Sequence, residues 1–468
     1  MPRLLGESLV ERGVITQEQL DEAIQRQQIN GGRLGENLVA LGHLNEDGAR
    51  QFFRKVPPPP RRVEDTQLGL SFIVDLVVKH LSLLGECSIS EVVGSTKLTL
   101  SVVDEALRTL RRERMVEVRG SGVTSELGYQ FALTEMGKNR AQTLLELSRY
   151  VGPAPVVLTE YRDMVETQTI KSILVSEDTV SNAFSHVVIK PEILRRLGPA
   201  VSSGRAMFIY GPPGNGKTTI AETIGGILPG TVYLPYSILV RGEIITLFDQ
   251  ISHVVVDPEV SSEMVDQRWV LVRRPVVRAG GELTLKTLDL DFNPVNRFYE
   301  APLQMKANNG LLIVDDFGRQ LVDPHILLNR WIVPLERRAD YLTLHTGMKF
   351  EIPFDLLVVF ATNIEPKELV DEAFLRRMPY KIRVDHPDVM QYKAIFQLVC
   401  ESNGVDFNEE VFEFLLYNCY REMEVNLSAC HPRDLVQHVI ESSRYFGVRP
   451  ELSKETITHA WESYFVDL

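Results

Sequence analysis

The run Gly211-Pro212-Pro213-Gly214-Asn215-Gly216-Lys217-Thr218-Thr219 fits the pattern GxxxxGK[ST]. It lies between a predicted strand at 206–210 and a predicted helix that begins near Thr218. Its glycines allow successive backbone N–H groups to point at a phosphate, and the helix adds its positive N-terminal end. In such loops the lysine reaches the β- and γ-phosphates and the Ser/Thr hydroxyl ligates Mg²⁺. The run therefore predicts that residues 211–219 bind a nucleoside triphosphate.

The composition is typical of a globular protein, with 44% hydrophobic and 24% charged residues. A length of 468 residues suggests about three domains. We expect a cytoplasmic protein without membrane insertion, because no segment approaches the ~18 apolar residues of a membrane span and the N-terminus becomes charged too early for a signal peptide. The four cysteines have no metal-ligand spacing and are typical of reduced thiols. A net charge of −13 argues against non-specific nucleic-acid binding by the whole surface.

Polar residues follow two further apolar runs. The run 311–314 (LLIV) reads as a buried strand of a parallel sheet and ends in Asp315 and Asp316. At this edge of the sheet Asp315 is predicted to hold Mg²⁺, and Asp316 to orient and deprotonate the attacking water. The run 356–361 (LLVVFA) ends in Thr362-Asn363, and we expect the Asn363 amide to contact the γ-phosphate and the water.

Arginines follow these strands along the chain. Arg376 and Arg377 end a predicted helix, where they complement its negative end or reach the γ-phosphate bound to a neighbouring subunit. Arg433 opens a helix of the C-terminal segment and is predicted to fold over the phosphates.

In this order the five elements resemble those of the AAA+ ATPases: Walker A, Walker B, sensor 1, arginine finger and sensor 2. The resemblance covers roughly 180–468 and is nearest to the MoxR-like branch. It implies an α/β P-loop fold with an αβα core and a helical lid, assembly into a ring (commonly hexameric), and catalytic sites shared between subunits. Catalytic roles would fall to Lys217, Asp316, Asn363, Arg376, Arg377 and Arg433, ATP binding to 211–219, and Mg²⁺ binding to Thr218 and Asp315.

The sequence departs from that family in two places. The second acid after the Walker B strand is usually Glu, whereas Asp316 is one methylene shorter, so the water must lie closer or hydrolysis is slow; we favour hydrolysis. Lys217 and Asp315 are also 98 positions apart, more than is usual in the family. The additional residues include a predicted hairpin from Trp269 to Leu290, turning at 279–281, which is either a substrate-engaging pore loop or a solvated decoration.

The first segment contains an internal repeat, because 5–13 recurs at 34–42 with six of nine residues identical. It resembles the N-terminal domain of type II secretion and pilus-assembly ATPases (the GspE/MshE type). In some members, tandem RLGxxLVxxG motifs bind cyclic di-GMP. Arg33 matches the second motif, whereas Arg3 lies one position early in the first. The segment therefore either binds cyclic di-GMP or serves as a helical docking module, and the sequence leaves both alternatives open.

Residues 66 to about 147 read as three helices, a hairpin and a helix, the order of a winged helix-turn-helix. Residues 61–146 hold 11 basic and 12 acidic residues, and Asp104 and Glu105 lie near the start of the predicted recognition helix. DNA readers usually contact bases with that part of the helix. Protein docking is therefore favoured over DNA binding.

We predict the following division: 1–56 helical domain, 57–65 Pro-rich linker, 66–148 winged-helix domain, 149–178 linker, 179–388 nucleotide-binding core and 389–468 helical lid. The predicted function is Mg²⁺-dependent ATP hydrolysis by a ring that remodels an unidentified protein partner. Two alternatives are an ATP-controlled DNA-binding regulator and a cyclic-di-GMP-responsive accessory ATPase of a pilus or secretion system.

Overall fold

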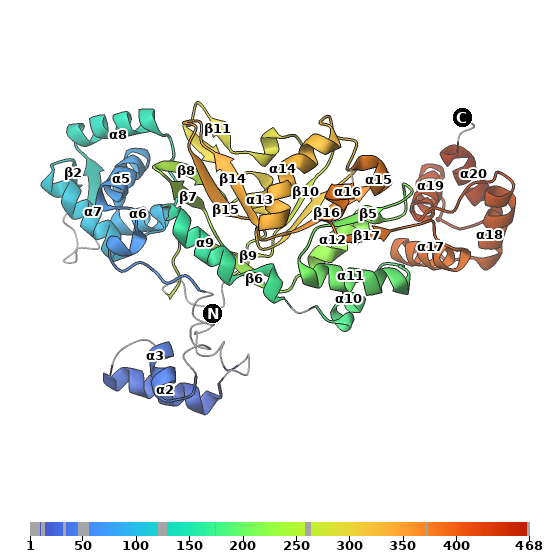
Figure 1. Ribbon diagram of the computed structural model, residues 1–468, viewed down its shortest axis with the longest axis horizontal. Coiled ribbons are helices and arrows are strands. Elements are labelled where there is room, and N and C mark those ends of the chain that lie inside the picture. Colours follow the sequence, from blue (N-terminus) through green and yellow to red (C-terminus); the bar gives the residue numbers. More distant parts are fainter. Residues whose placement is uncertain are drawn as a thin grey trace.

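The computed structural model describes residues 10, 15–30, 34–44, 56–119, 129–173, 175–257, 264–370 and 372–465. Figure 1 shows a central region of sheets flanked by a mainly helical domain at each end. Among the described residues, no helix has both the length and the apolar character needed to cross a membrane.

The most N-terminal described part is a pair of helices, α2 (Gln17–Asn30) and α3 (Leu34–Ala40). They enclose a small core of Ile15, Leu20, Ala23, Leu38 and Leu44. The first copy of the sequence repeat lies, apart from Val10, outside the described residues, as do Arg3 and Arg33.

The next domain has α5 (Leu70–Leu84), β1 (Cys87–Ser88), α6 (Ile89–Thr96), α7 (Leu100–Arg112), β2 (Val116–Arg119), β3 (Gln130–Leu133) and α8 (Glu135–Leu147). Its three strands form an antiparallel sheet in the order β1-β3-β2. A capping box fixes the start of α6, since the Ser88 side chain accepts from the Glu91 backbone N–H while the Glu91 carboxylate accepts from the Ser88 N–H.

The central sheet is parallel, with strand order β10 (Val276–Ala279), β13 (Leu311–Val314), β16 (Leu357–Thr362), β5 (Met207–Tyr210) and β17 (Tyr380–Arg383). The strand β13 and residues 357–361 of β16 are apolar because both faces of the sheet are covered. On one face α14 (Pro324–Arg337) packs Trp331 against Phe208 and Phe360. On the other, α11 (Pro191–Ser203) and α12 (Lys217–Ile227) pack against Ile209 and Ile313. This layering is the predicted αβα core.

The predicted hairpin from Trp269 to Leu290 is wrong. Its first half contains two strands that belong to different sheets: β9 (Trp269–Arg273) pairs antiparallel with β6 (Thr231–Pro235), whereas β10 joins the edge of the parallel sheet beside β13. The residues after Gly281 form a turn of 3-10 helix, Lys286–Leu288. The pore-loop interpretation of this segment loses its structural basis.

Four strands of a second sheet lie in the interval between Lys217 and Asp315. Its order is β11 (Asp291–Asn293), β12 (Phe298–Glu300), β8 (Glu243–Thr246), β7 (Ser237–Val240) and β4 (Val156–Val157). It is followed along the chain by the short helix α13 (Leu303–Lys306), and the hairpin β14 (Ala339–Thr343)–β15 (Lys349–Pro353) precedes β16. The core is therefore extended by a second sheet that contacts the domain of α5 to α8.

The segment 149–178 is not a simple linker, because it contains β4, α9 (Leu158–Thr167) and α10, which begins at Glu177 (Glu177–Ala183). Tyr150 packs edge-on against Phe298 of β12, and its hydroxyl lies 2.9 Å from the Ser237 hydroxyl of β7. Ile244 of β8 belongs to the same hydrophobic cluster as Ile73 and Val103 of the preceding domain. These contacts join that domain to the inserted sheet.

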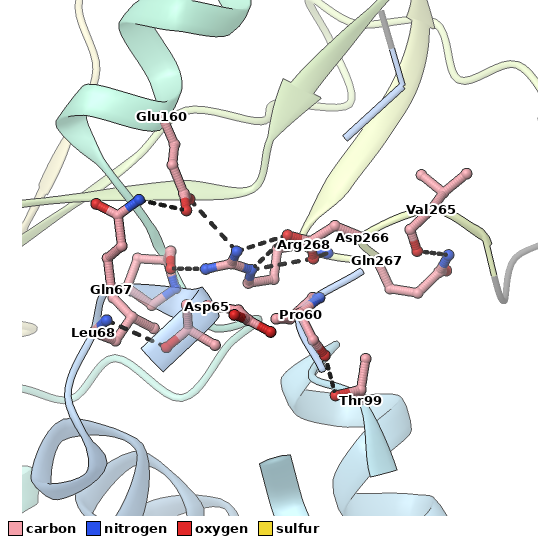
Figure 2. Close-up of polar contacts among 12 residues, drawn as sticks. Pro60, Asp65, Gln67, Leu68, Thr99, Glu160, Val265, Asp266, Gln267 and Arg268 are labelled. Carbon is pink, nitrogen blue, oxygen red and sulfur yellow. Dashed lines mark hydrogen bonds and ion pairs between the residues drawn. The ribbon is translucent and has the colours of Figure 1, made fainter. Parts of the chain in front are cut away.

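The Pro-rich segment is also packed against its surroundings. The Asp266 N–H donates to the Pro57 carbonyl (2.9 Å), and the Thr99 hydroxyl donates to the Pro60 carbonyl (2.7 Å). Figure 2 shows the adjacent buried Arg268, whose guanidinium binds the Asp266 carboxylate and lies 3.5 Å from Glu160. Gln67 donates to the same Glu160 carboxylate from the N-terminal side of α5. Residues 57–68, α9 and 264–268 thus meet at one polar joint.

The C-terminal helices are α17 (Val389–Asn403), α18 (Glu409–Phe414), α19 (His431–Phe446) and α20 (Lys454–Tyr464), with a π-helical stretch at Leu415–Arg421. They share one core that includes Tyr392, Phe412, Leu435 and Trp461. Figure 1 places these helices beyond the β5 and β17 side of the central sheet.

Candidate functional site

The loop between β5 and α12 has a conformation that requires glycine. Gly211 and Gly214 have φ of +140° and +74°, in the region that residues with a Cβ rarely adopt. A Cβ on Gly211 would lie 2.2 Å from the Val384 carbonyl oxygen, and one on Gly214 would lie 2.6 Å from the Ser428 hydroxyl. The loop therefore packs tightly against both β17 and the C-terminal helical domain.

Lys217 begins α12 and turns its side chain back over the loop. Its Nζ donates to the Gly211 carbonyl (3.0 Å) and the Pro212 carbonyl (2.7 Å), and the residue is 7% exposed. Burial lowers the pKa of this ammonium, while the Asp316 and Asp315 carboxylates raise it in opposition. The loop thus holds a desolvated lysine where its positive charge can meet a phosphate.

Thr218 and Asp315 meet although they are far apart in the sequence. The Thr218 hydroxyl lies 3.1 Å and 3.0 Å from the two carboxylate oxygens of Asp315, which follows β13. A hydroxyl and a carboxylate are hard oxygen ligands, and Mg²⁺ bound with a nucleotide commonly has one or two protein ligands beside phosphate and water. This donor pair fits Mg²⁺. Within the described ranges, no group of three or more His, Cys, Asp or Glu side chains could hold a metal.

Asp316 and Asn363 lie at the same edge of the sheet. The Asn363 amide nitrogen is 3.5 Å from an Asp316 carboxylate oxygen. Asp316 is exposed and has a left-handed backbone with φ of +47°. The carboxylate is therefore accessible to solvent beside the loop, with the amide at the end of β16 next to it.

The C-terminal helical domain closes the other side. The Cys430 N–H donates to the Gly214 carbonyl (2.8 Å), and the Asn215 amide oxygen accepts from the Ala429 N–H (3.1 Å). A pocket of about 360 Å³ lies between the two domains. It is lined by residues 213–219, Asp315, Asp316, 361–363, Ala429, Cys430 and Arg433.

The predicted arginines have different positions. Arg433 lines this pocket and is largely exposed, with its Nε donating to Asp434 (3.1 Å). Arg376 and Arg377 do not line it; Arg377 forms an ion pair with Glu336 of α14, and Arg376 is exposed. The structure thus brings together every predicted site residue except those two and Gly211 and Pro212, whose carbonyls hold Lys217.

Besides Ala361, Thr362, Ala429 and Cys430 of the pocket wall, two residues that contact the acidic turn were not predicted. Gln320 is 9% exposed, and its amide donates to the carbonyls of Asp315 (3.1 Å) and Asp316 (3.3 Å), which holds the acidic turn. Arg278 of β10 forms an ion pair with Asp315 at 2.7 Å. For Gln320, the sequence offered only its position four residues after Asp316, within reach of the turn that follows the strand. Arg278 was assigned to the hairpin that does not exist.

Comparisons with known proteins found matches to parts of the chain. A family model described as a domain of unknown function (DUF8689) matches residues 388–463, which span α17 to α20. A probable spastin homolog of Brugia malayi is 24% identical over 247 residues, covering 51% of this chain and 42% of that protein. The vesicle-fusing ATPase of Dictyostelium discoideum is 45% identical over 53 residues, 11% of this chain and 7% of that protein.

Among solved structures, the RuvB Holliday junction branch migration motor of Thermotoga maritima is 13% identical, covers 66% of this chain and 72% of that one, and has a TM-score of 0.32. So low a score supports no inference. The chain spans less than half the length of these two curated relatives. Together with the phosphate-binding loop and the five-stranded parallel sheet, these partial sequence similarities support a P-loop ATPase core of the AAA+ type.

Proposed function

We propose that the chain hydrolyses ATP at the pocket between the parallel sheet and the C-terminal helices. The observation that carries the proposal is the convergence of Lys217, Thr218, Asp315, Asp316 and Asn363 on one pocket. These five side chains come from three separate segments. Such a convergence supplies a cation for phosphate, two oxygen ligands for Mg²⁺, a carboxylate and an amide, the set that phosphoryl transfer to water requires.

Each side chain has a role in this proposal. The loop N–H groups and Lys217 bind the phosphates and neutralise charge that develops on them. Bound Mg²⁺, held by Thr218 and Asp315, would supply further neutralisation of the phosphate charge. Asp316 accepts a hydrogen bond, and then the proton, from the attacking water, while Asn363 orients that water and the terminal phosphate. Arg433 approaches the phosphates from the C-terminal helices.

Lys217→Ala tests the binding part of this proposal. The loss of the cation is expected to abolish ATP binding or turnover, because the Lys217 ammonium is held against the loop by the Gly211 and Pro212 carbonyls. Titration with a fluorescent ATP analogue and a steady-state phosphate-release assay would measure the two. Lys393→Ala, in α17 outside the pocket, is the matched control and is expected to behave as wild type. Normal turnover by Lys217→Ala would contradict the site assignment.

We also propose that copies of the chain form a ring, commonly hexameric in the MoxR-like branch, that remodels a protein partner. Arg376 is exposed and outside its own pocket, as a residue that completes the site of a neighbouring copy must be. If so, Arg376→Ala lowers turnover without weakening ATP binding to the isolated chain. Mixing Arg376→Ala with Lys217→Ala protein is then expected to restore part of the activity at mixed interfaces.

The domain 66–148 is proposed to be a winged helix that docks a protein. One observation favours this role over DNA binding. At the N-terminus of α7 the Thr99 and Ser101 hydroxyls donate to the Pro60 and Arg61 carbonyls (2.7 and 2.8 Å), so the preceding segment covers the end of the helix that DNA readers use. We expect no salt-dependent binding of duplex DNA; such binding at low salt would favour the regulator.

Cyclic di-GMP binding by residues 1–56 stays a prediction from the sequence, because both motif arginines lie outside the described residues. Isothermal titration of the full chain with cyclic di-GMP would test it. Heat at micromolar ligand that Arg33→Ala removes would support the accessory-ATPase alternative, and no heat would leave these helices as a docking module.

A further inference from the structure

Arg278 places a guanidinium on the carboxylate that is proposed to hold Mg²⁺. It lies on β10, which pairs with β13 so that Arg278 is opposite Ile313, two residues before Asp315. Its Nη2 lies 2.7 Å from Asp315 Oδ2, and its Nη1 lies 2.8 Å from a carboxylate oxygen of Glu222 on α12. One arginine thus bridges the acidic turn and the helix that follows the phosphate-binding loop.

The strand itself does not need an arginine at this position. Its neighbours Val277 and Ala279 are buried and hold β10 in the sheet, whereas the Arg278 side chain is 53% exposed. Asp315, by contrast, is 9% exposed and already accepts from the Thr218 hydroxyl and the Asp316 N–H. The contact therefore places a cation on a carboxylate whose other hydrogen bonds all come from the nucleotide site.

A guanidinium and a divalent cation compete for the same carboxylate oxygen. The charge-assisted hydrogen bond from Arg278 to Asp315 belongs to the strong class of protein hydrogen bonds. A metal ion at Asp315 and the Arg278 guanidinium are both positive and would repel each other at this distance. A metal bound at Asp315 places a divalent charge next to the guanidinium and so weakens or displaces its ion pair. Glu222 offers Arg278 a second carboxylate to which it stays bound when it leaves Asp315.

From this geometry we infer that Arg278 is a positioning residue that sets the Mg²⁺ concentration at which the site binds ATP. The inference rests on the proposed function, since it needs the pocket to bind ATP with Mg²⁺. Arg278 holds the Asp315 carboxylate until Mg²⁺ takes it over, and Glu222 retains the displaced guanidinium. Removing the positive charge at 278 lowers the Mg²⁺ requirement, and removing the charge of Glu222 raises it.

The test is a titration of MgCl₂ into the full-length chain with a fluorescent ATP analogue at fixed concentration. For Arg278→Met, which keeps an apolar stem without the charge, we expect a midpoint about two- to fivefold below wild type, the range of a partly exposed ion pair. Arg278→Lys keeps the charge and should stay close to wild type. Arg273→Met is the matched control, because Arg273 is an exposed residue of β9, which pairs with β6 and not with β13.

An unchanged or raised midpoint in Arg278→Met would overturn the inference. Glu222→Gln provides an independent variant should Arg278→Met not fold. The midpoint of its MgCl₂ titration is expected to rise, and a fall would contradict the proposed role of Arg278. If the wild-type chain binds no ATP analogue at any Mg²⁺ concentration, the proposed function fails instead. If it binds and the two variants match it, only the role of Arg278 fails.

Discussion

Asp316 combines an accessible carboxylate with a backbone that few residues adopt. Its φ of +47° lies in the left-handed region, where Asp and Asn are several-fold enriched over other non-glycine residues. The Gln320 amide fixes the turn by donating to the carbonyls of Asp315 and Asp316. This conformation gives a physical reason for the shorter acid at a position where AAA+ proteins usually have Glu.

Asp316→Asn separates binding from hydrolysis. Asparagine tolerates the same left-handed backbone, so the variant should fold and bind ATP normally, but its amide cannot take a proton from water. We expect turnover to fall by about 10²- to 10⁴-fold, the usual contribution of a general base. Phosphate release and ATP-analogue binding would be measured side by side. Asp323→Asn, at the N-cap of α14, controls for the loss of one exposed carboxylate. Normal turnover by Asp316→Asn would show that another group activates the water.

Cys430 offers a chemical probe of the pocket. It lines the cavity, whereas Cys87, Cys400 and Cys419 are buried, and burial raises the pKa of those three thiols to about 11, about 12 and about 11. Alkylation depends on the thiolate. A brief treatment with a maleimide should therefore modify Cys430 first, and ATP with Mg²⁺ should slow that modification. Peptide mass spectrometry would read it, with Cys430→Ser as control. Equal labelling with and without ATP would contradict a nucleotide beside Cys430.

At the residue scale, the sequence predicted the site through motifs at strand ends. Five residues were predicted because they lie in the glycine loop or follow an apolar strand, and they do line one pocket: Lys217, Thr218, Asp315, Asp316 and Asn363. Arg278 could not be predicted in the same way. Its relation to Asp315 depends on which strand lies beside β13, and no local pattern specifies that neighbour.

At the element scale, β10 shows how the error arose. The sequence 269–290 has two β-rich runs around Gly280 and Gly281, which favours a hairpin. In the structure β9 and β10 both lie before Gly280 and belong to different sheets, because β9 pairs with β6 and β10 with β13, and a turn of 3-10 helix follows the glycines. The buried side chains of Val277 and Ala279 alternate with exposed neighbours, as expected for an edge strand, so the pattern fitted both arrangements.

The polar joint around Arg268 makes the stability of the protein depend on pH, through the carboxyl of Glu160. Burial raises the pKa of the Glu160 carboxyl from 4.5 to about 7. The positive charge of Arg268 lowers this pKa, but by less than burial raises it, and Arg268 lies closer to Asp266 than to Glu160. Between these values the folded protein carries a proton on Glu160 that the unfolded chain lacks. This group therefore makes the wild-type protein less stable as the pH rises through that window.

Glu160→Gln removes the ionisation. Relative to wild type, its free energy of unfolding should increase from about pH 5 to about pH 8, by at most about 3 kcal/mol. Urea unfolding at several pH values would measure the difference, with Glu113→Gln, an exposed residue, as the control for lost charge. A difference between Glu160→Gln and wild type that does not change with pH would contradict the ionisation of Glu160 in this window.

At the scale of the whole molecule, the inserted sheet joins the parts. The core extends through β7, β8 and β12 to the domain of α5 to α8, and the phosphate-binding loop contacts the C-terminal helical domain through Asn215 and Gly214. The lid and core were predictable from motif order. The inserted sheet was not, since β4 comes from a segment that reads as a linker and pairs with β7 about 80 residues later.

The most direct test of the account is ATP turnover per chain, measured with Mg²⁺ over a wide range of protein concentration. We predict hydrolysis whose rate per chain rises with concentration and then saturates, as the proposal that Arg376 of one copy completes the site of another requires. A constant rate would keep the ATPase and remove the shared site. An absence of hydrolysis at every concentration would contradict the central claim that this pocket is an ATPase site.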